Sequence, residues 1–379
     1  MSTSTVPTSS SSSSSPSSAS TADKLKALRK AMTYAEVDCF IVPTEDPHMS
    51  EYTAPYYYRR EWISGFTGSA GTVVVTKNDA LLFTDGRYHN QAEMELTAEW
   101  TLMRQGLKDV PTLIEWMAKE LPTGSVIGVD PFLHAATTMK KIEETMAPQG
   151  ITIKRMTENP IDKIWTEGRP ACPDGVIRVH AIEYAGKSVA DKLTDIRTAL
   201  TKSHAAALVS ASLDEIAWMY NIRGSDVPCN PVTVSYAVVG MTDAHLFIDA
   251  EKVPSEVHAH LEAAGVRVLP YEQALPFVQR LGGAGSKVWL DGKTVNYAVY
   301  NSVPTDQRVD KSSPITLMKA VKNEAELQGM RACHYRDGAA ESEFLAWLEE
   351  ELAVRPADRP ITEVELDERV STQGGTGAG

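Results

Sequence analysis

The order of expected helices and strands occurs twice between residues 23 and 318, and this internal repeat restricts the chain to a fold built from two similar units. Each copy reads as a helix, a buried strand, a strand pair joined by a short turn, a later helix and a closing strand. The expected strands are residues 39–42, 72–76, 80–85 and 126–130 in the first copy, and 206–209, 232–239, 245–249 and 288–291 in the second. Helices that alternate with strands, with one hairpin per copy, predict an α/β fold in which each mixed sheet is flanked by helices.

Composition marks the expected boundaries. Residues 1–22 are nearly all Ser, Thr, Ala and Pro, which cannot bury enough apolar surface to offset the entropy of ordering. A targeting segment is the alternative for this stretch, although it lacks the arginines typical of one. The expected divisions are a disordered Ser-rich tail (1–22), a first domain (23–165), a proline-rich linker (160–175), a second domain (174–316) and a third segment (319–379), which opens with one long amphipathic helix and ends in a glycine-rich tail.

The bulk composition excludes several classes of protein. The formal charge of −13 argues against nucleic-acid binding, which depends on a clustered basic surface. No apolar run approaches the roughly 20 residues of a membrane-spanning helix, so no membrane contact is expected. The four cysteines are scattered without C-x-x-C spacing, which argues against a zinc or redox pair. We therefore expect buried cysteines in a reducing compartment and a cytoplasmic location.

Glycine-containing motifs in the chain predict turns and caps rather than nucleotide sites. Gly186-Lys187-Ser188 lies where a phosphate loop would place these residue types, but the motif also requires a glycine at the position of Ala181. Helix capping by Ser188 is the better interpretation. The three glycines within residues 65–71 precede a strand, whereas a dinucleotide fingerprint follows one, so they predict a tight turn.

Two histidine-containing pairs are candidate metal ligands. His258 and His260 are two residues apart, which places them on different sides of a helix. His334 and Asp337 are three apart and their side chains converge on one helix face, but no cluster of further ligands accompanies them. Solvated helix surface is the expected environment for both pairs.

A run of charged residues in the second unit has two interpretations. Asp214, Glu215, Arg223 and Asp226 read either as an acid–base cluster or as a capped helix followed by a charged turn. The sequence favours the second interpretation, with a capping box between Ser212 and Glu215.

The T-D-G-R-Y stretch at residues 84–88 also leaves two possibilities open. Arg87 follows a glycine turn, so its guanidinium is able to reach out of its own unit to a carboxylate or carbonyl. The alternative is a local pair between Arg87 and Asp85.

Several stretches resemble the cytosolic Xaa-Pro aminopeptidases (aminopeptidase P). In the first unit these are S-G-F-T-G-S-A-G-T at 64–72, T-D-G-R-Y at 84–88, W-T-L-M at 100–103 and N-P-I-D-K-I-W at 159–165. Residues 213–226 are similar to the second domain of that family, and K-A-V-K-N-E-A-E-L at 319–327 to the entry helix of its third. The resemblance covers about residues 23–351.

This resemblance implies two creatinase-N-terminal-like domains followed by a "pita-bread" catalytic domain. In that family the catalytic domain holds two manganese or similar ions through two Asp, one His and two Glu, and a metal-bridging water attacks the bond before proline. The family's substrates are peptides with proline at the second position, and its members form homodimers in which the first domain lines the substrate cleft. The resemblance assigns Arg87 a substrate-contact or gating role.

The pattern departs from the family from Ser371 onward, and none of the five metal ligands has a counterpart in this sequence. The expectation is therefore the N-terminal two-thirds of such an enzyme, which supplies dimerisation and cleft walls without a catalytic residue, metal or cofactor of its own. One alternative is a complete manganese metalloaminopeptidase of which this sequence is a fragment. Another is a non-catalytic acidic binding module for a basic partner.

Overall fold

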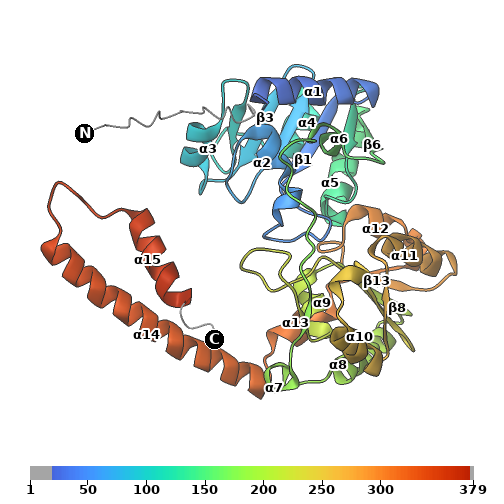
Figure 1. Cartoon of the computed structure of the whole chain (residues 1–379). Coiled ribbons are helices and arrows are strands. Elements are labelled where there is room, and N and C mark those ends of the chain that lie inside the picture. The colour runs from blue at the N-terminus through green and yellow to red at the C-terminus, as the bar shows by residue number, and fades with distance from the viewer. Residues whose placement is uncertain (1–18, 376–379) are drawn as a thin grey trace, which may run out of the picture.

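The computed structural model describes residues 19–375, in which two α/β domains lie one above the other and a helical arm extends from the second (Figure 1). Most of the predicted Ser-rich tail, residues 1–18, and the end of the glycine-rich tail, residues 376–379, lie outside the described residues. The first helix begins at Thr21 and Ser20 caps it by accepting a hydrogen bond from the Asp23 amide. The last residues assigned to the tail therefore belong to the first domain.

The first domain is a six-stranded mixed sheet with strand order β4-β3-β2-β1-β5-β6. Its strands are β1 (Cys39–Pro43), β2 (Thr72–Thr76), β3 (Ala80–Thr84), β4 (Thr101–Arg104), β5 (Val126–Val129) and β6 (Thr152–Arg155). Its helices are α1 (Thr21–Tyr34), α2 (Arg59–Ser64), α3 (His89–Glu95), α4 (Leu113–Glu120), α5 (Ala136–Met146) and α6 (Pro160–Ile164), with short 3₁₀ turns η1 (Pro55–Tyr57) and η2 (Ala147–Gln149). The pairs β1–β2 and β2–β3 are antiparallel, and the other pairs are parallel.

The second domain repeats this sheet with strand order β12-β11-β10-β8-β13-β14 and the same sequence of antiparallel and parallel pairs. Its strands are β8 (Ala207–Ser210), β10 (Tyr236–Gly240), β11 (Ala244–Phe247), β12 (Val266–Leu269), β13 (Val288–Leu290) and β14 (Arg308–Asp310); β7 (Arg178–Val179) and β9 (Ile222–Arg223) pair separately. Its helices are α7 (Ile182–Ala185), α8 (Val189–Lys202), α9 (Leu213–Met219), α10 (Ser255–Ala263), α11 (Ala274–Gly283), α12 (Tyr297–Asn301) and α13 (Pro314–Ala320), with turns η3 (Ala250–Lys252), η4 (Tyr271–Gln273) and η5 (Thr305–Gln307). The predicted repeat and fold class are confirmed.

One apolar core runs through both domains. Successive strand residues face opposite sides of a sheet, so in β1 Cys39 and Ile41 enter the shared core while Phe40 and Val42 face α1 and α2. The shared core continues through Val209 of β8 and the side chains of α5, α11 and α12. The two domains are therefore packed against each other rather than joined only by a linker.

Main-chain hydrogen bonds at this interface are arranged symmetrically. The segments around the starts of α5 and α12 are joined by four hydrogen bonds, which form two symmetric pairs. Residues related by the symmetry are 161 positions apart in the sequence, as 136 is from 297 and 134 from 295. The bonds are Ala136 N to Val295 O (3.3 Å) with Tyr297 N to His134 O (2.8 Å), and Thr137 N to Gly292 O (2.9 Å) with Ala298 N to Pro131 O (2.9 Å). The domains are thus related by a local pseudo-twofold axis.

Side chains of α5 and α12 add polar contacts on either side of this axis. Tyr297 donates its hydroxyl hydrogen to Glu143 at 2.6 Å. Tyr300 donates to Asp310 at 2.6 Å, and Lys140 of the first domain donates to that same carboxylate at 2.9 Å. Both tyrosines therefore belong to hydrogen-bonded groups that hold the domains together.

The linker is shorter than the sequence predicted. Pro160 starts α6 instead, with Asn159 as its N-cap, and α6 packs against α1. Proline is favoured at the first helical position, where no amide hydrogen is needed. The prediction also missed the four outer strands β4, β6, β12 and β14, which extend each sheet at both edges.

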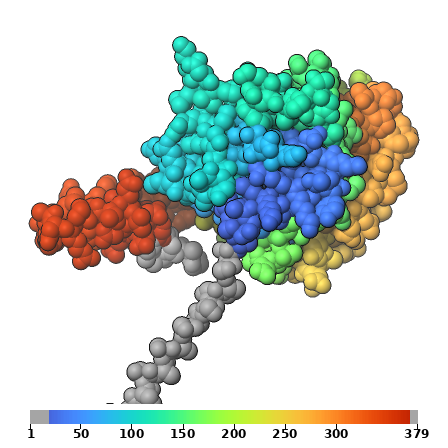
Figure 2. Space-filling view, turned by 90° about the horizontal axis from the view of Figure 1, so that it is seen from above, coloured from blue at the N-terminus to red at the C-terminus, as the bar shows by residue number. Residues whose placement is uncertain are grey.

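The third segment forms a helical arm, and the prediction of one continuous helix from Lys319 is wrong. Helix α13 ends at Ala320, and Asn323 opens α14 (Glu324–Val354) with a capping box completed by Glu326. Helix α14 is followed by α15 (Glu363–Gly375), and no side chain of α14 is fully buried. Figure 2 shows the arm projecting away from the two domains. Across residues 19–375, no helix combines the length and apolarity needed to cross a membrane.

Candidate functional site

Three loops of the first domain converge at one edge of its sheet. They are residues 44–53 after β1, 65–71 before β2 and 85–88 after β3. The strand register explains their proximity, because Pro43 at the end of β1 pairs with Thr72, which in turn pairs with Phe83 near the end of β3. We call these residues the loop cluster.

A buried arginine shapes the middle loop. Arg60 of α2 donates from Nε to the Thr44 hydroxyl at 2.9 Å and from Nη1 to the Phe66 carbonyl at 2.8 Å, and it also donates to the Gly68 carbonyl. Gly65 ends α2 in a left-handed conformation with φ of 78°, so the predicted tight turn is present. Burial lowers the pKa of Arg60 to about 10. No local sequence pattern indicates that this arginine would be buried.

Arg87 lies on the rim of the loop cluster and pairs locally. Its guanidinium donates to both carboxylate oxygens of Asp85 at 2.9 Å, and its guanidinium carbon lies 5.1 Å from the centre of the Tyr88 ring. Hydrogen bonds from Arg87 lower the pKa of Asp85 to about 2. The Arg87 side chain remains 69% exposed. The local pair is thus formed, and the guanidinium stays accessible to a molecule outside its own domain.

The loop cluster lines three neighbouring hollows with volumes of about 170, 330 and 690 Å³. Glu51 borders all three, and Tyr52 borders the smallest and the largest. Asp85 lines the middle one, and the largest extends to Ser212 and Cys229 of the second domain. The cluster therefore forms a concave surface to which both domains contribute.

A buried histidine fastens the first loop to the second domain. His48 is within hydrogen-bond distance of the Ala211 carbonyl through Nδ1 (3.0 Å) and of the Tyr271 hydroxyl through Nε2 (2.9 Å). A carbonyl only accepts, so Nδ1 carries the hydrogen and Nε2 accepts from Tyr271. Burial lowers the pKa of His48, which keeps the ring neutral. Asp46 accepts from the amides of His48 and Ser50 and thereby fixes the start of the loop.

The charged residues of the second domain do not form an acid–base cluster, but the predicted capped helix with a charged turn is correct only in part. Asp226 is buried and pairs with Lys252 at 2.7 Å, whereas Asp214 pairs with Lys319 on the surface. The predicted capping box at Ser212 is wrong, because the Glu215 side chain turns inward. It accepts hydrogen bonds from the hydroxyls of Ser210, Ser313 and Thr316.

The described residues do not supply a metal site. No group of three or more His, Cys, Asp or Glu side chains in residues 19–371 is arranged to hold an ion. The manganese pair implied by the resemblance therefore does not fit these residues, and no chemical step through it is assigned to them. The prediction of buried cysteines holds only for Cys39, because Cys172 and Cys229 lie in loops and Cys333 lies on the uncovered α14.

Comparisons with known proteins agree with this architecture. Sequence profiles of the creatinase/prolidase N-terminal domain match residues 24–163 and 168–326. A probable Xaa-Pro aminopeptidase P from Aspergillus clavatus is 45% identical in a match of 341 residues that covers 88% of this chain and 52% of that protein. The chain belongs to the creatinase/prolidase N-terminal domain family. A second probable Xaa-Pro aminopeptidase P, from Pyrenophora teres f. teres, is 44% identical over 89% of this chain and 53% of its own length.

A solved family member has the same arrangement of domains. The X-prolyl aminopeptidase of Caenorhabditis elegans, described as a cytosolic enzyme with a di-nuclear active site, matches 93% of this chain with a TM-score of 0.88 and 35% identity. The match covers 59% of the nematode chain. The chain studied spans about half the length of the curated relatives that it matches. This share is less than the two-thirds expected from the resemblance.

Proposed function

We propose that this Xaa-Pro aminopeptidase P homologue forms the substrate-cleft wall of a peptidase that removes the residue preceding proline from the N-terminus of peptides. The match to the nematode enzyme over 93% of the chain carries the proposal. In this proposal, hydrolysis and the two manganese ions that the resemblance implies depend on residues other than those matched here. We expect the described residues alone to hydrolyse no peptide.

Within this function, Arg87 contacts the substrate. Its only ion-pair partner within the described residues is Asp85, whose side chain is 42% exposed. Water screens an exposed pair, so this contact can open to another anion although two parallel hydrogen bonds hold it. A peptide carboxylate offers the guanidinium fork the same two acceptors and can therefore exchange with Asp85.

Association into a homodimer in the cytoplasm is part of the proposal. The arm exposes large apolar side chains, and such surfaces favour contact between proteins. They include Met330 (47% exposed), Leu345 (52%), Leu352 (59%) and Val354 (77%). The cytosolic description of the nematode enzyme supports the location. Light scattering tests the assembly, and a monomer at all concentrations would contradict it.

A complementation assay tests the cleft-wall role. The purified chain is mixed with Mn²⁺, an alanyl-prolyl peptide and a separately expressed second half of the Aspergillus clavatus relative. We expect alanine release from the mixture and none from either polypeptide alone. Release by this chain alone, or none from a mixture shown to associate, would refute the proposal.

The same assay tests Arg87. We expect Arg87→Ala to raise KM or lower kcat/KM at least several-fold in the active mixture. Arg280→Ala is the matched control, because Arg280 is also an exposed arginine beside an aromatic ring, that of Phe277, but lies in the second domain. Equal effects of the two substitutions would remove Arg87 from the substrate contact.

A further inference from the structure

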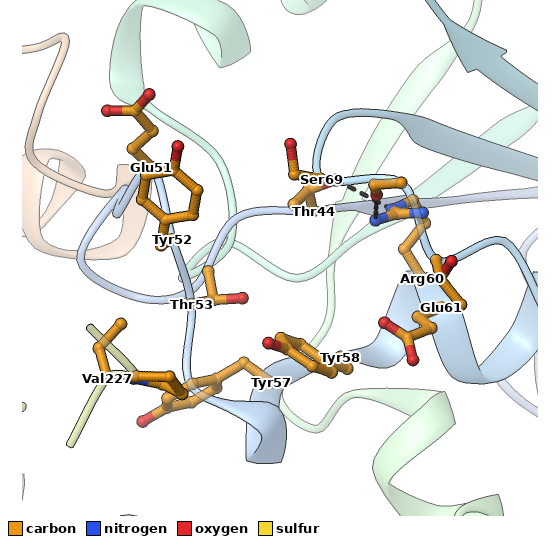
Figure 3. A pocket seen from close by; sticks show the side chains of 13 residues that line it. Thr44, Glu51, Tyr52, Thr53, Tyr57, Tyr58, Arg60, Glu61, Ser69 and Val227 are labelled. Carbon is orange, nitrogen blue, oxygen red and sulfur yellow. Dashed lines mark hydrogen bonds between the residues drawn. The ribbon is translucent and has the colours of Figure 1, made fainter. Parts of the chain in front are cut away.

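The smallest hollow of the loop cluster has features of a ligand pocket that the cleft-wall function does not use. It lies between the first loop, helix α2 and the Val227-Pro228 turn of the second domain, and has a volume of about 170 Å³. Figure 3 shows Arg60 and Glu61 on one side of it, with Thr53, Tyr57 and Tyr58 around the remaining space. We call it the Arg60 pocket. Arg87 does not line it.

Two hydroxyl groups in the wall of this pocket lack partners. Thr53 and Tyr57 are each only 6% exposed, yet within the described part of the chain neither hydroxyl makes a hydrogen bond. Their oxygen atoms are not sealed from solvent, so each hydroxyl can exchange a water molecule for a polar group of a ligand. Both groups border the hollow, so a polar molecule inside it would supply the missing partners.

Two opposite charges in the wall, Arg60 and Glu61, attract each other only at long range and form no ion pair with the described residues. Arg60 is 5% exposed and donates only to neutral oxygens; among the described residues no carboxylate lies within ion-pair distance of it. Glu61, the next residue of α2, is half-buried and forms neither a hydrogen bond nor an ion pair with the described residues. Burial raises the pKa of its carboxyl group. A charge removed from water is stabilised by an opposite charge, so this pocket suits a molecule that carries both signs.

We propose that the Arg60 pocket binds a small zwitterion, a free amino acid or dipeptide, with its carboxylate towards Arg60 and its ammonium group towards Glu61. The hydroxyls of Thr53 and Tyr57 complete its hydrogen bonds, and the tyrosine rings contact its aliphatic part. A cavity of roughly 150 Å³ holds benzene, so 170 Å³ admits an amino acid of the size of proline. This binding does not depend on the proposed peptidase role.

Isothermal titration of the full chain with L-proline and L-alanyl-L-proline tests the proposal, with N-acetyl-proline, prolinamide and N-acetyl-prolinamide as probes that lack one or both charges. We expect saturable binding of the zwitterions, at least tenfold weaker binding of each singly charged probe, and none of the neutral one, because charge-assisted contacts are lost. No saturable binding of either zwitterion up to 50-fold excess at about 1 mM protein, or equal binding of the neutral probe, would overturn the proposal.

Variants locate the binding in this pocket. Glu61→Gln keeps the shape of a half-exposed side chain and should weaken L-proline binding about tenfold or more, while binding of N-acetyl-proline stays unchanged. Glu144→Gln makes the same chemical change on the exposed surface of α5 and should have no effect. Thr53→Val and Tyr57→Phe each remove one unpartnered hydroxyl and should weaken binding in a protein whose circular dichroism is unchanged. Binding that survives Glu61→Gln and Tyr57→Phe without change would place the ligand elsewhere and refute the assignment.

Discussion

The buried ion pair of the second domain leads to a quantitative prediction about stability. The Asp226 side chain is fully buried, and its Oδ2 accepts from the Val234 amide (2.7 Å), the Thr233 hydroxyl (3.0 Å) and the Lys252 ammonium (2.7 Å). Its Oδ1 accepts from the Gly175 amide at 3.1 Å. Asp226→Asn leaves the Lys252 charge, itself only 4% exposed, without an opposite charge. Removing one partner of a buried pair costs about 3–5 kcal/mol.

Urea unfolding monitored by tryptophan fluorescence measures this cost, since Trp218 and Trp289 report on the second domain. A loss of this size should lower the unfolding midpoint by roughly 1–2 M urea. Asp226→Asn combined with Lys252→Met should recover part of the loss, because no uncompensated charge remains.

The matched control is Asp243→Asn, whose carboxylate is half-exposed and lies 3.9 Å from the ring of His245; it should change the free energy of unfolding by less than about 0.5 kcal/mol. A cost below about 1 kcal/mol for Asp226→Asn, or a double variant less stable than Asp226→Asn alone, would refute the reasoning.

Three further predictions concern pH, the arm and the domain interface. Burial lowers the pKa of His134 to about 4, so below about pH 6.5 the unfolded chain binds more protons than the folded chain. The free energy of unfolding should therefore fall by about 2 kcal/mol between pH 7 and 5, and His134→Gln should flatten this dependence in urea unfolding. An unchanged slope would be the contrary result. Glu326→Gln weakens the bond from the Trp218 indole (3.0 Å) that anchors the start of the arm, so limited proteolysis should cut α14 several-fold faster; an unchanged rate would contradict this anchoring role. Tyr297→Phe removes the hydroxyl that bonds to Glu143 across the domain interface and should cost about 1–2 kcal/mol of stability in thermal unfolding. The control Tyr34→Phe, at a residue that is 79% exposed, should cost almost nothing. Equal costs would argue against the contact.

The central strands could be predicted from sequence because their burial is continuous. In β1 all five residues are buried, and the apolar run at residues 39–42 marks it clearly. The outer strands gave no such signal, since β6 and β14 are short, charged and partly exposed. Their strand conformation depends on pairing with β5 and β13, which a local pattern does not report.

The site was predictable only where it is local. The glycine turn and the exposed Arg87 follow from short motifs. The role of His48 depends on Ala211 and Tyr271, which lie 163 and 223 positions along the chain. Arg60 likewise could not be distinguished from its neighbour Arg59, although their partners differ: Arg59 pairs with Asp162 and Arg60 with neutral oxygens. Long-range packing decides these roles, and one sequence alone does not contain it.

The pseudo-twofold contact between the domains has a consequence for the amino-acid substitutions that each of its two sides can accept. In a dimer of identical subunits every substitution at the symmetric surface occurs twice, so both sides change together. Here each side is encoded separately. Asn296 caps α12 and donates to the Pro47 carbonyl of the first domain at 2.7 Å, whereas Ala135, at the matching position before α5, has no side chain that can do either. The backbone hydrogen bonds at this contact are therefore symmetric, whereas the side chains are not. The first domain contains the loop cluster and the second domain carries the arm, so the two copies differ in what they support.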